Sequence, residues 1–250
     1  MRTFMRILSA EQIKMSRSYI WVLLLVSPAI SVVIGALADV TEGTTGGITW
    51  QILLGVMAMA HSMLFLPVLS GIFAALICRS EHSDGGWKQL LALPVTRGTV
   101  YLAKFAMIML LLAAVQLLFL GALLGVGLFR GAEGAVPWGK LAASLFGGWF
   151  ACLPLAALQL AVSQRWTSFG APLALNVSLT IPNMLVANSA DYGPYYPWLQ
   201  PMLAMSPMSY YGDETFGAFN LPLASLMIVV TGSLVLFLAA GFISFRRKAV

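Results

Sequence analysis

The chain has 250 residues, of which 60% are hydrophobic and only 9% are charged. Soluble domains carry roughly 25% charged residues, so this composition excludes the soluble globular class and predicts an integral membrane protein. The formal net charge is +5, but the basic residues border the apolar segments instead of forming one patch, which argues against nucleic-acid binding.

The chain begins with a basic leader, residues 1–18, in which apolar and basic residues are mixed. This mixture predicts an amphipathic helix on the inner membrane surface, and a plain orientation signal is the alternative. Ala36-Leu37-Ala38 is typical of a signal-peptidase site, but the apolar run before it is longer than the 7–15 residues of a signal sequence. We therefore expect the first span to be retained, and residues 19–250 to form one membrane domain.

Six segments are apolar enough to cross a membrane, since a spanning helix needs about 20 mostly apolar residues. Pro67 is expected to kink or tilt the second span, and the fifth span is short and contains two prolines. The predicted fold is all-α, and Cys78 and Cys152 are expected to be small buried hydrophobes. The six segments are Tyr19–Ala38, Ile52–Ile77, Leu102–Phe129, Leu141–Val162, Pro172–Ala187 and Leu221–Phe245.

The basic residues orient these spans. Of the 14 lysines and arginines, four precede the first span, four lie between the second and third, one follows the fourth and three follow the sixth. Only Arg130 and Lys140 are on the other side. The positive-inside rule then places both termini in the cytoplasm, which requires an even number of spans.

The connection between the fifth and sixth spans, residues 188–220, is the long segment of the outer side. It contains four prolines, six Tyr or Trp residues and several apolar residues. A solvated loop would be more polar, so we expect a re-entrant segment of short helices that dip into the outer leaflet and pack on the spans.

Sites for chemistry are not predicted in this chain. Residues 134–140 nearly spell a P-loop, but Leu141 stands where the Ser or Thr that holds magnesium would be, and no strand precedes it. No catalytic constellation and no metal-ligand spacing occurs. We expect no nucleotide, cofactor or metal bound by this chain, and no catalytic residue.

Among the polar residues inside the predicted spans, His61, Gln116, Asn176 and Asn183 are singled out. Each costs free energy in the membrane unless it is paired. They are candidates for lining a transport path, and hydrogen bonding between helices is the alternative. We expect no Asp, Glu, Lys or Arg in the core of any span, so energy for transport would come from a partner.

The polar segment between the second and third spans, residues 79–97, is predicted to be cytoplasmic. Ser83 or Asp84 can cap a short helix there, Gly85-Gly86 allow a sharp turn, and Pro94 ends the helix. Trp87, Leu90 and Leu91 share one face, which suits a docking surface. The alternative is a hairpin that only joins two spans.

This segment resembles the coupling-helix region of ABC-2 type transporter permeases. The resemblance rests on an acidic residue, a glycine, a short amphipathic helix, a Leu-Pro and an arginine ahead of the third span. In this chain it covers Glu81, Gly86, Trp87, Lys88, Leu90, Leu91, Pro94 and Arg97, followed by Lys104 at the head of the span. At about 250 residues, the chain looks most like the lantibiotic-immunity subgroup.

The resemblance implies a bacterial cell-membrane permease that pairs with a second copy or a related permease. Two ATP-binding-cassette ATPase subunits, which hold ATP and Mg, would bind the coupling helices. Glu81 and Arg97 would fix the loop, and Trp87, Leu90 and Leu91 would enter a groove on the ATPase. The cargo would be an amphipathic antimicrobial peptide or a similar lipophilic substrate, taken from the membrane and expelled. An ion-coupled secondary transporter and a non-transporting scaffold or sensor are the alternatives.

Overall fold

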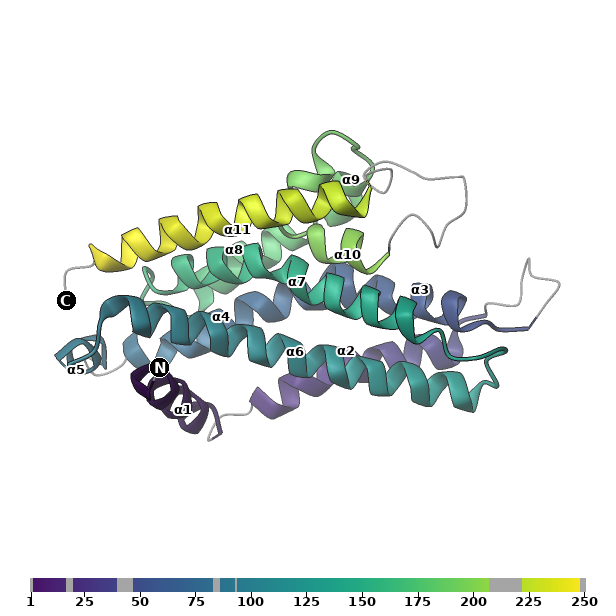
Figure 1. Cartoon of the computed structure of the whole chain (residues 1–250), viewed down its shortest axis with the longest axis horizontal. Helices are drawn as coiled ribbons and strands as arrows, with labels where there is room; N and C mark the ends of the chain where they lie inside the picture. The colour runs from purple at the N-terminus through teal and green to yellow at the C-terminus, as the bar shows by residue number, and fades with distance from the viewer. Residues whose placement is uncertain are drawn as a thin grey trace.

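The computed structural model describes residues 2–16, 20–39, 47–82, 86–92, 94–206 and 222–247. Over these residues the chain is a bundle of long helices that run roughly along its longest axis (Figure 1). Six helical segments are long and apolar enough to cross a membrane, which confirms the predicted all-α fold and number of spans. They run over Ile20–Leu37, Trp50–His82, Arg97–Phe129, Trp138–Ser163, Gly170–Ala187 and Leu223–Arg246.

The third and fourth spans form the centre of the bundle. Helix α6 (Arg97–Phe129) packs against α2 (Ile20–Leu37) and α7 (Trp138–Ser163), and α7 also packs against α11 (Leu223–Arg246). Lipid tails are as apolar as leucine, so close packing and interhelical hydrogen bonds hold such helices together. Only 17% of the most apolar window of α11 is buried, so most of its surface is left for lipid or a partner.

The second span is not one regular helix. It consists of α3 (Trp50–Ala60), a turn of π-helix, η1 (His61–Phe65), and α4 (Leu66–His82). Pro67 has no backbone N–H, so it cannot bond the Met63 carbonyl one turn earlier, and the irregular turn lies just before it. The disturbance expected at Pro67 is therefore a change of helical hydrogen bonding.

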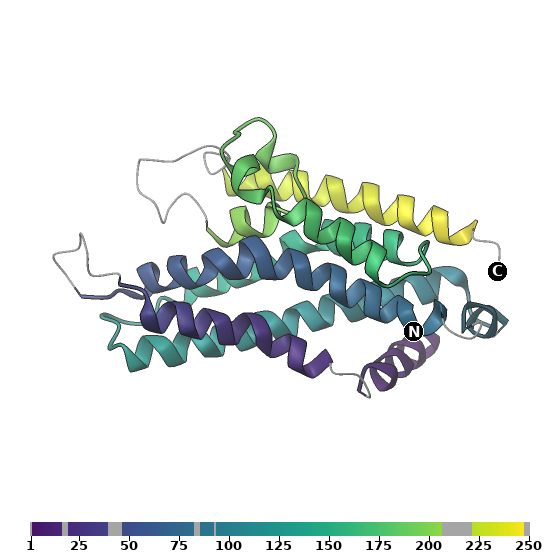
Figure 2. The same ribbon diagram turned by 180° about the vertical axis from the view of Figure 1, so that it is seen from behind.

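The fifth span is also interrupted, into α8 (Gly170–Thr180) and α9 (Asn183–Ala187). Figure 2 shows α8 lying along α4 on the back of the bundle, in agreement with the contacts between them. Gly71 makes this approach possible, because a Cβ there would lie 2.2 Å from the Asn176 amide nitrogen.

The outer connection forms short helices over its described part, residues 188–206: η2 (Gly193–Tyr195) and α10 (Gln200–Met205). All six residues of α10 are buried, mainly against α7. Gly147 and Gly148 leave room for it, since a Cβ on Gly148 would lie 2.3 Å from the Met205 side chain. The rest of the expected re-entrant segment, 207–221, lies outside the described residues.

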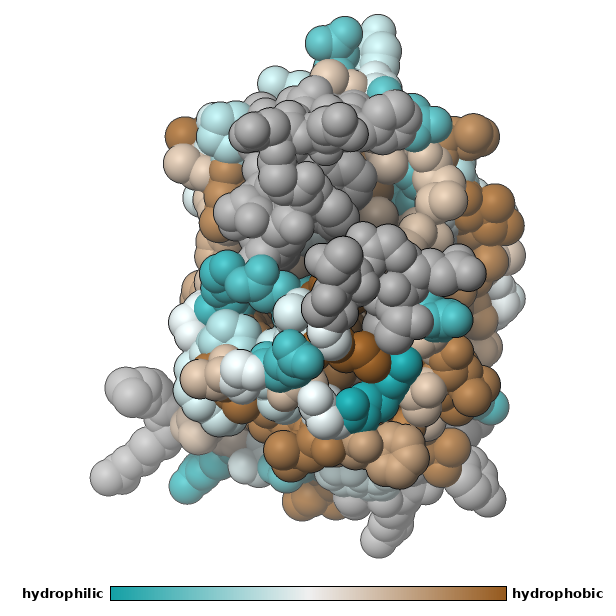
Figure 3. Space-filling view, turned by 90° about the vertical axis from the view of Figure 1, so that its right-hand side faces the viewer, coloured by the Kyte–Doolittle hydropathy of each residue, from teal (hydrophilic) through white to brown (hydrophobic). Residues whose placement is uncertain are grey.

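The two ends of the bundle differ. The N-terminal helix α1 (Arg2–Ser16), α5 (Gly86–Ala92) and the last turn of α11 all lie at one end (Figure 1). At the other end Arg130 donates to the Gly35 and Ala38 carbonyls, which satisfies the last turn of α2. Figure 3 views that end: hydrophilic residues gather near its middle, and hydrophobic residues dominate its right and lower edges.

Candidate coupling site

The residues predicted to receive energy from a partner lie at the end of the bundle that carries α1 and α5. Helix α5 begins directly against the end of α4. A Cβ on Gly86 would lie 2.8 Å from the Ser80 carbonyl oxygen and 2.9 Å from Glu81 Cα. Backbone on backbone cannot yield as a flexible side chain can, so only glycine permits this contact. Ser83, Asp84 and Gly85, the expected cap and turn, lie outside the described residues.

Trp87 fixes α5 to the bundle. Its side chain is only 6% exposed, and its indole N–H donates to His82 Nδ1 over 3.3 Å. The indole also meets the Phe245 ring edge-on, with centroids 5.3 Å apart. His82 Nε2 lies 2.9 Å from the Ser163 carbonyl, so the same contacts reach the end of α7. Trp87 was expected to face a partner. In the structure its side chain packs inside the same chain.

The surface that α5 leaves open is formed by Lys88, Gln89 and Ala92, which are all exposed. Leu90 is half-buried against the core of the bundle. Nothing is described of the Leu91 side chain, and Pro94 is exposed just after the helix. Among the described side chains, the exposed surface of α5 is therefore mostly polar.

A cluster of four charged side chains lies beneath α5. Lys104, the eighth residue of α6, is 1% exposed, and its ammonium group is 2.9 Å from Glu11 Oε1 and 3.0 Å from Glu81 Oε1. It also donates to the Ile77 carbonyl over 3.2 Å and lies 5.6 Å from the Trp87 ring centroid. Lys14 adds a second cation, 2.6 Å from Glu81.

This buried charge lies at the ends of the second and third spans, so it does not contradict the expectation that no charged residue lies in the core of a span. The charges of the two lysines and the two glutamates sum to zero. Each hydrogen bond of Lys104 replaces a hydrogen bond to water that its ammonium group loses on burial. Because Glu11 and Lys14 belong to α1, Glu81 to α4 and Lys104 to α6, the cluster joins three helices. Glu81 was expected to fix the adjoining loop, and in the structure it also connects α4 to α1 and α6.

Glu11 was missed by the sequence prediction, although a signal for it existed. Ile7, Glu11 and Met15 recur every fourth residue, which places them on one helix face, and all three are buried. Met5 and Ile13 remain exposed on α1. The leader is thus a helix, as expected, but one of its faces is docked on the bundle.

Arg97 links the start of α6 to the end of the chain. Its guanidinium group donates to the Arg246 carbonyl over 2.9 Å, so it satisfies one of the open carbonyls at the end of α11. Thr96 caps α6 by accepting a bond from the Thr99 backbone N–H over 3.2 Å. The residues around α5 are therefore tied to α1, α4, α6, α7 and α11.

Two of the candidate path residues, His61 and Gln116, bond to each other. His61 is fully buried and stacks on Phe119, with centroids 4.1 Å apart. Its Nε2 lies 3.2 Å from the Gln116 carboxamide oxygen, and its Nδ1 lies 2.6 Å from the Ser27 hydroxyl. A neutral ring that donates from Nε2 and accepts at Nδ1 satisfies both contacts.

Gln116 also reaches a surface groove between α6 and α7. The groove has a volume of about 380 Å³ and is almost wholly apolar. Its other lining residues are Ala113, Leu117, Leu120, Ala142, Leu145, Phe146 and Trp149. Of the four candidates for lining a path, Gln116 is the one that lines this groove.

Asn176 and Asn183 donate hydrogen bonds to backbone carbonyls at the irregular part of the second span. Asn183 donates over 2.8 Å to the Met63 carbonyl, the acceptor that Pro67 leaves open. Asn176 donates to the Pro67 carbonyl over 2.9 Å and accepts from the Trp198 indole N–H over 2.8 Å. Both asparagines are buried, so hydrogen bonding between segments is the role the structure gives them.

A comparison with protein-family models gives the family of this chain. The model for the ABC-2 family transporter protein matches residues 7–183, from the docked face of α1 to the first residue of α9. The chain belongs to the ABC-2 transporter family. The coupling segment, the charge cluster and both asparagines lie within the matched part. No curated protein matches the chain.

An ABC-2 permease is the transmembrane component of a transporter and has no nucleotide-binding domain of its own. The near P-loop at residues 134–140 forms a turn, with Gly134 at φ +83°, and the first residues of α7. Among the described residues, no group of three His, Cys, Asp or Glu side chains is placed to hold a metal ion.

Proposed function

We propose that this ABC-2 permease is the membrane subunit of an ATP-driven exporter and that separate ATPase subunits, carrying ATP and Mg, dock on α5. The observation that supports this most directly is the set of contacts around Trp87 and Lys104. A force applied to a seven-residue helix reaches five other helices because α5 is anchored by a buried indole beside a buried charge cluster. A hairpin that only joined two spans would not need these contacts.

The docking surface in this proposal is the exposed side of α5, with Lys88 and Gln89 at its centre. Trp87 transmits the movement to α4, α6 and α11 instead of entering the ATPase. In the bacterial cell membrane both termini would face the cytoplasm, which places α1, α5 and the basic end of α11 on the ATPase side.

Docking on α5 predicts that Lys88→Glu with Gln89→Glu abolishes copurification of the ATPase. The matched control is Arg6→Glu with Ser9→Glu, because it makes the same change of charge on exposed positions of α1 at the same end. The measurement is the ATPase-to-permease ratio after affinity purification of the complex. An unchanged ratio in the α5 variant, or equal loss in both variants, would contradict docking on α5.

We further propose that the cargo is an amphipathic antimicrobial peptide or a similar lipophilic molecule and that a second permease copy completes the path. The apolar groove between α6 and α7 supports this, because it opens on the flank of the bundle and has one polar group, Gln116, at its wall. Such a groove can bind the apolar side of a cargo molecule, while the Gln116 carboxamide hydrogen-bonds a polar group of the same molecule.

Narrowing this groove is expected to lower export without loss of the ATPase. Ala142→Trp fills the groove, whereas Ala143→Trp adds the same side chain at an exposed position that does not line it. Cells expressing the permease and its ATPase would be challenged with an added lantibiotic-type peptide. We expect protection to fall about tenfold in Ala142→Trp only, which corresponds to about 1.4 kcal/mol. Equal protection in both variants would exclude this groove from the path.

A further inference from the structure

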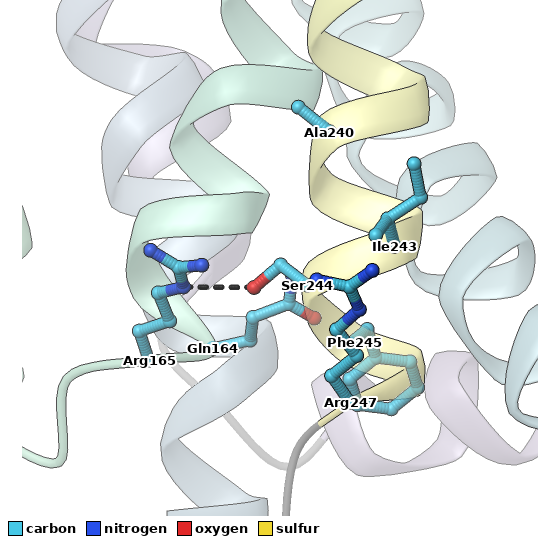
Figure 4. Close-up of a pocket in the computed structure, with 7 residues that line it drawn as sticks. All are labelled: Gln164, Arg165, Ala240, Ile243, Ser244, Phe245 and Arg247. Carbon is cyan, nitrogen blue, oxygen red and sulfur yellow. Dashed lines mark hydrogen bonds between the residues drawn. The ribbon is translucent and has the colours of Figure 1, made fainter.

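A second groove lies where α7 and α11 end, beside the coupling site, with which it shares Phe245. It has a volume of about 430 Å³ and is lined by Gln164, Arg165, Ala240, Ile243, Ser244, Phe245 and Arg247. Figure 4 draws Ser244 between the two guanidinium groups, which come from the ends of different helices. Arg165 Nε donates to the Ser244 hydroxyl over 2.7 Å. Both arginines are exposed, and the described lining contains no acidic residue.

Two backbone carbonyls near this groove already accept hydrogen bonds from other side chains. The Gly241 carbonyl accepts from Gln164 over 3.3 Å, and the Arg246 carbonyl accepts from Arg97 over 2.9 Å. The guanidinium groups of Arg165 and Arg247 are therefore not bonded to these two carbonyls. Their positive charge faces a hollow of a size and polarity that suits an anionic group.

The groove continues along the same two helices as an apolar channel. A neighbouring hollow of about 210 Å³ shares Arg165, Ala240 and Ser244 with the first. It adds Leu158, Ala161, Val162, Phe237 and Gly241. Phe237 lies seven residues before Ser244 on α11, so the channel extends about 10 Å toward the membrane interior at 1.5 Å per residue.

We propose that this composite groove binds one anionic phospholipid, with its phosphate at Arg165 and Arg247 and one acyl chain in the apolar channel. Charge complementarity selects the headgroup, because two arginines at the membrane boundary attract phosphate and an anionic leaflet. The apolar channel selects a lipid over a free phosphate, which has nothing to place there. The bound lipid would bridge the ends of α7 and α11, the helix pair that carries Ser163 and Phe245 of the coupling site.

The test uses the purified full chain in a zwitterionic detergent. Phosphatidylglycerol and phosphatidylcholine with identical acyl chains would be titrated in turn, and bound lipids counted by native mass spectrometry. We expect phosphatidylglycerol to bind about thirtyfold more tightly, the ratio for roughly 1 kcal/mol from each of the two arginines near the headgroup. Inorganic phosphate is expected to compete only weakly.

Two pairs of variants separate headgroup from acyl-chain binding. Arg165→Gln should lower the affinity for phosphatidylglycerol about fivefold, whereas Arg6→Gln, an equal loss of charge on exposed α1, should not. Ala240→Phe should block the channel for both lipids, whereas Ala239→Phe, at an exposed neighbour outside the lining, should not.

Several outcomes would overturn the proposal. Equal affinity for the two lipids, or equal behaviour of Arg165→Gln and Arg6→Gln, would mean that the arginines select no headgroup. Full competition by inorganic phosphate together with unaltered binding in Ala240→Phe would reduce the site to a simple anion site. Because no ATPase is needed, these results do not depend on docking at α5.

Discussion

Replacing Lys104 by methionine is expected to destabilise the folded permease by about 3–5 kcal/mol. The methionine is of similar length and fits the hydrocarbon part of the site, but it leaves Glu11 and Glu81 buried, 1% and 4% exposed, with only Lys14 to neutralise them. The cost comes from the uncompensated carboxylates more than from the lost attraction. Thermal unfolding of the purified chain in detergent, followed by circular dichroism, measures it.

The control for this prediction is Lys88→Met, the same substitution at an exposed position of α5. It is expected to change stability by less than about 0.5 kcal/mol. Adding Glu11→Gln and Glu81→Gln to Lys104→Met should recover most of the loss, since the three buried side chains are then uncharged and the remaining cation, Lys14, is partly exposed. Equal melting of Lys104→Met and Lys88→Met would show that the cluster contributes nothing to stability.

Trp87→Ala is expected to separate ATPase docking from transport. Truncating a buried tryptophan costs about 3–5 kcal/mol, and here it removes the contacts to Phe245, His82 and the Lys104 side of the cluster. The exposed side of α5 is unchanged, so the ATPase should still copurify. Transport by the reconstituted complex should fall by about tenfold or more, because movement of α5 no longer reaches α4, α6 and α11.

The matched control for Trp87→Ala is Trp138→Ala, at a tryptophan that is 59% exposed at the opposite end of the bundle. It should leave both docking and transport close to the parent protein. If Trp87→Ala instead lost the ATPase while Lys88→Glu with Gln89→Glu retained it, the apolar face of α5 would be the docking surface. Transport at the parent rate in Trp87→Ala would refute the proposed transmission of force.

The sequence predicted the spans well because long apolar runs have few alternatives. Backbone polar groups must be satisfied within the segment in lipid, so about 20 apolar residues form a helix whatever their neighbours. The position of Pro67 also had local meaning, as an interruption of the second span. The short buried helices after residue 188 followed from prolines and aromatic residues in a segment too apolar to be a loop.

The roles of polar side chains could not be predicted in the same way. The sequence around a buried asparagine does not show whether its side chain lines a path or replaces the N–H donor that a proline lacks. The role of Asn183 was decided only by its 2.8 Å hydrogen bond to the Met63 carbonyl. The local sequence predicts Trp87 to be an exposed anchor on a short amphipathic helix. It does not show that Phe245, 158 residues later, packs on the indole.

By itself, the sequence determined that the chain crosses a membrane six times, that basic residues gather at one end, and that a short polar segment with glycine and proline separates the second and third spans. These features depend on local composition and hydrogen bonding along the chain. Only the tertiary structure decided which side of α5 is free and that Glu11, Glu81 and Lys104 meet. Burial and ion pairing depend on distances between segments far apart in sequence, and packing alone sets those distances.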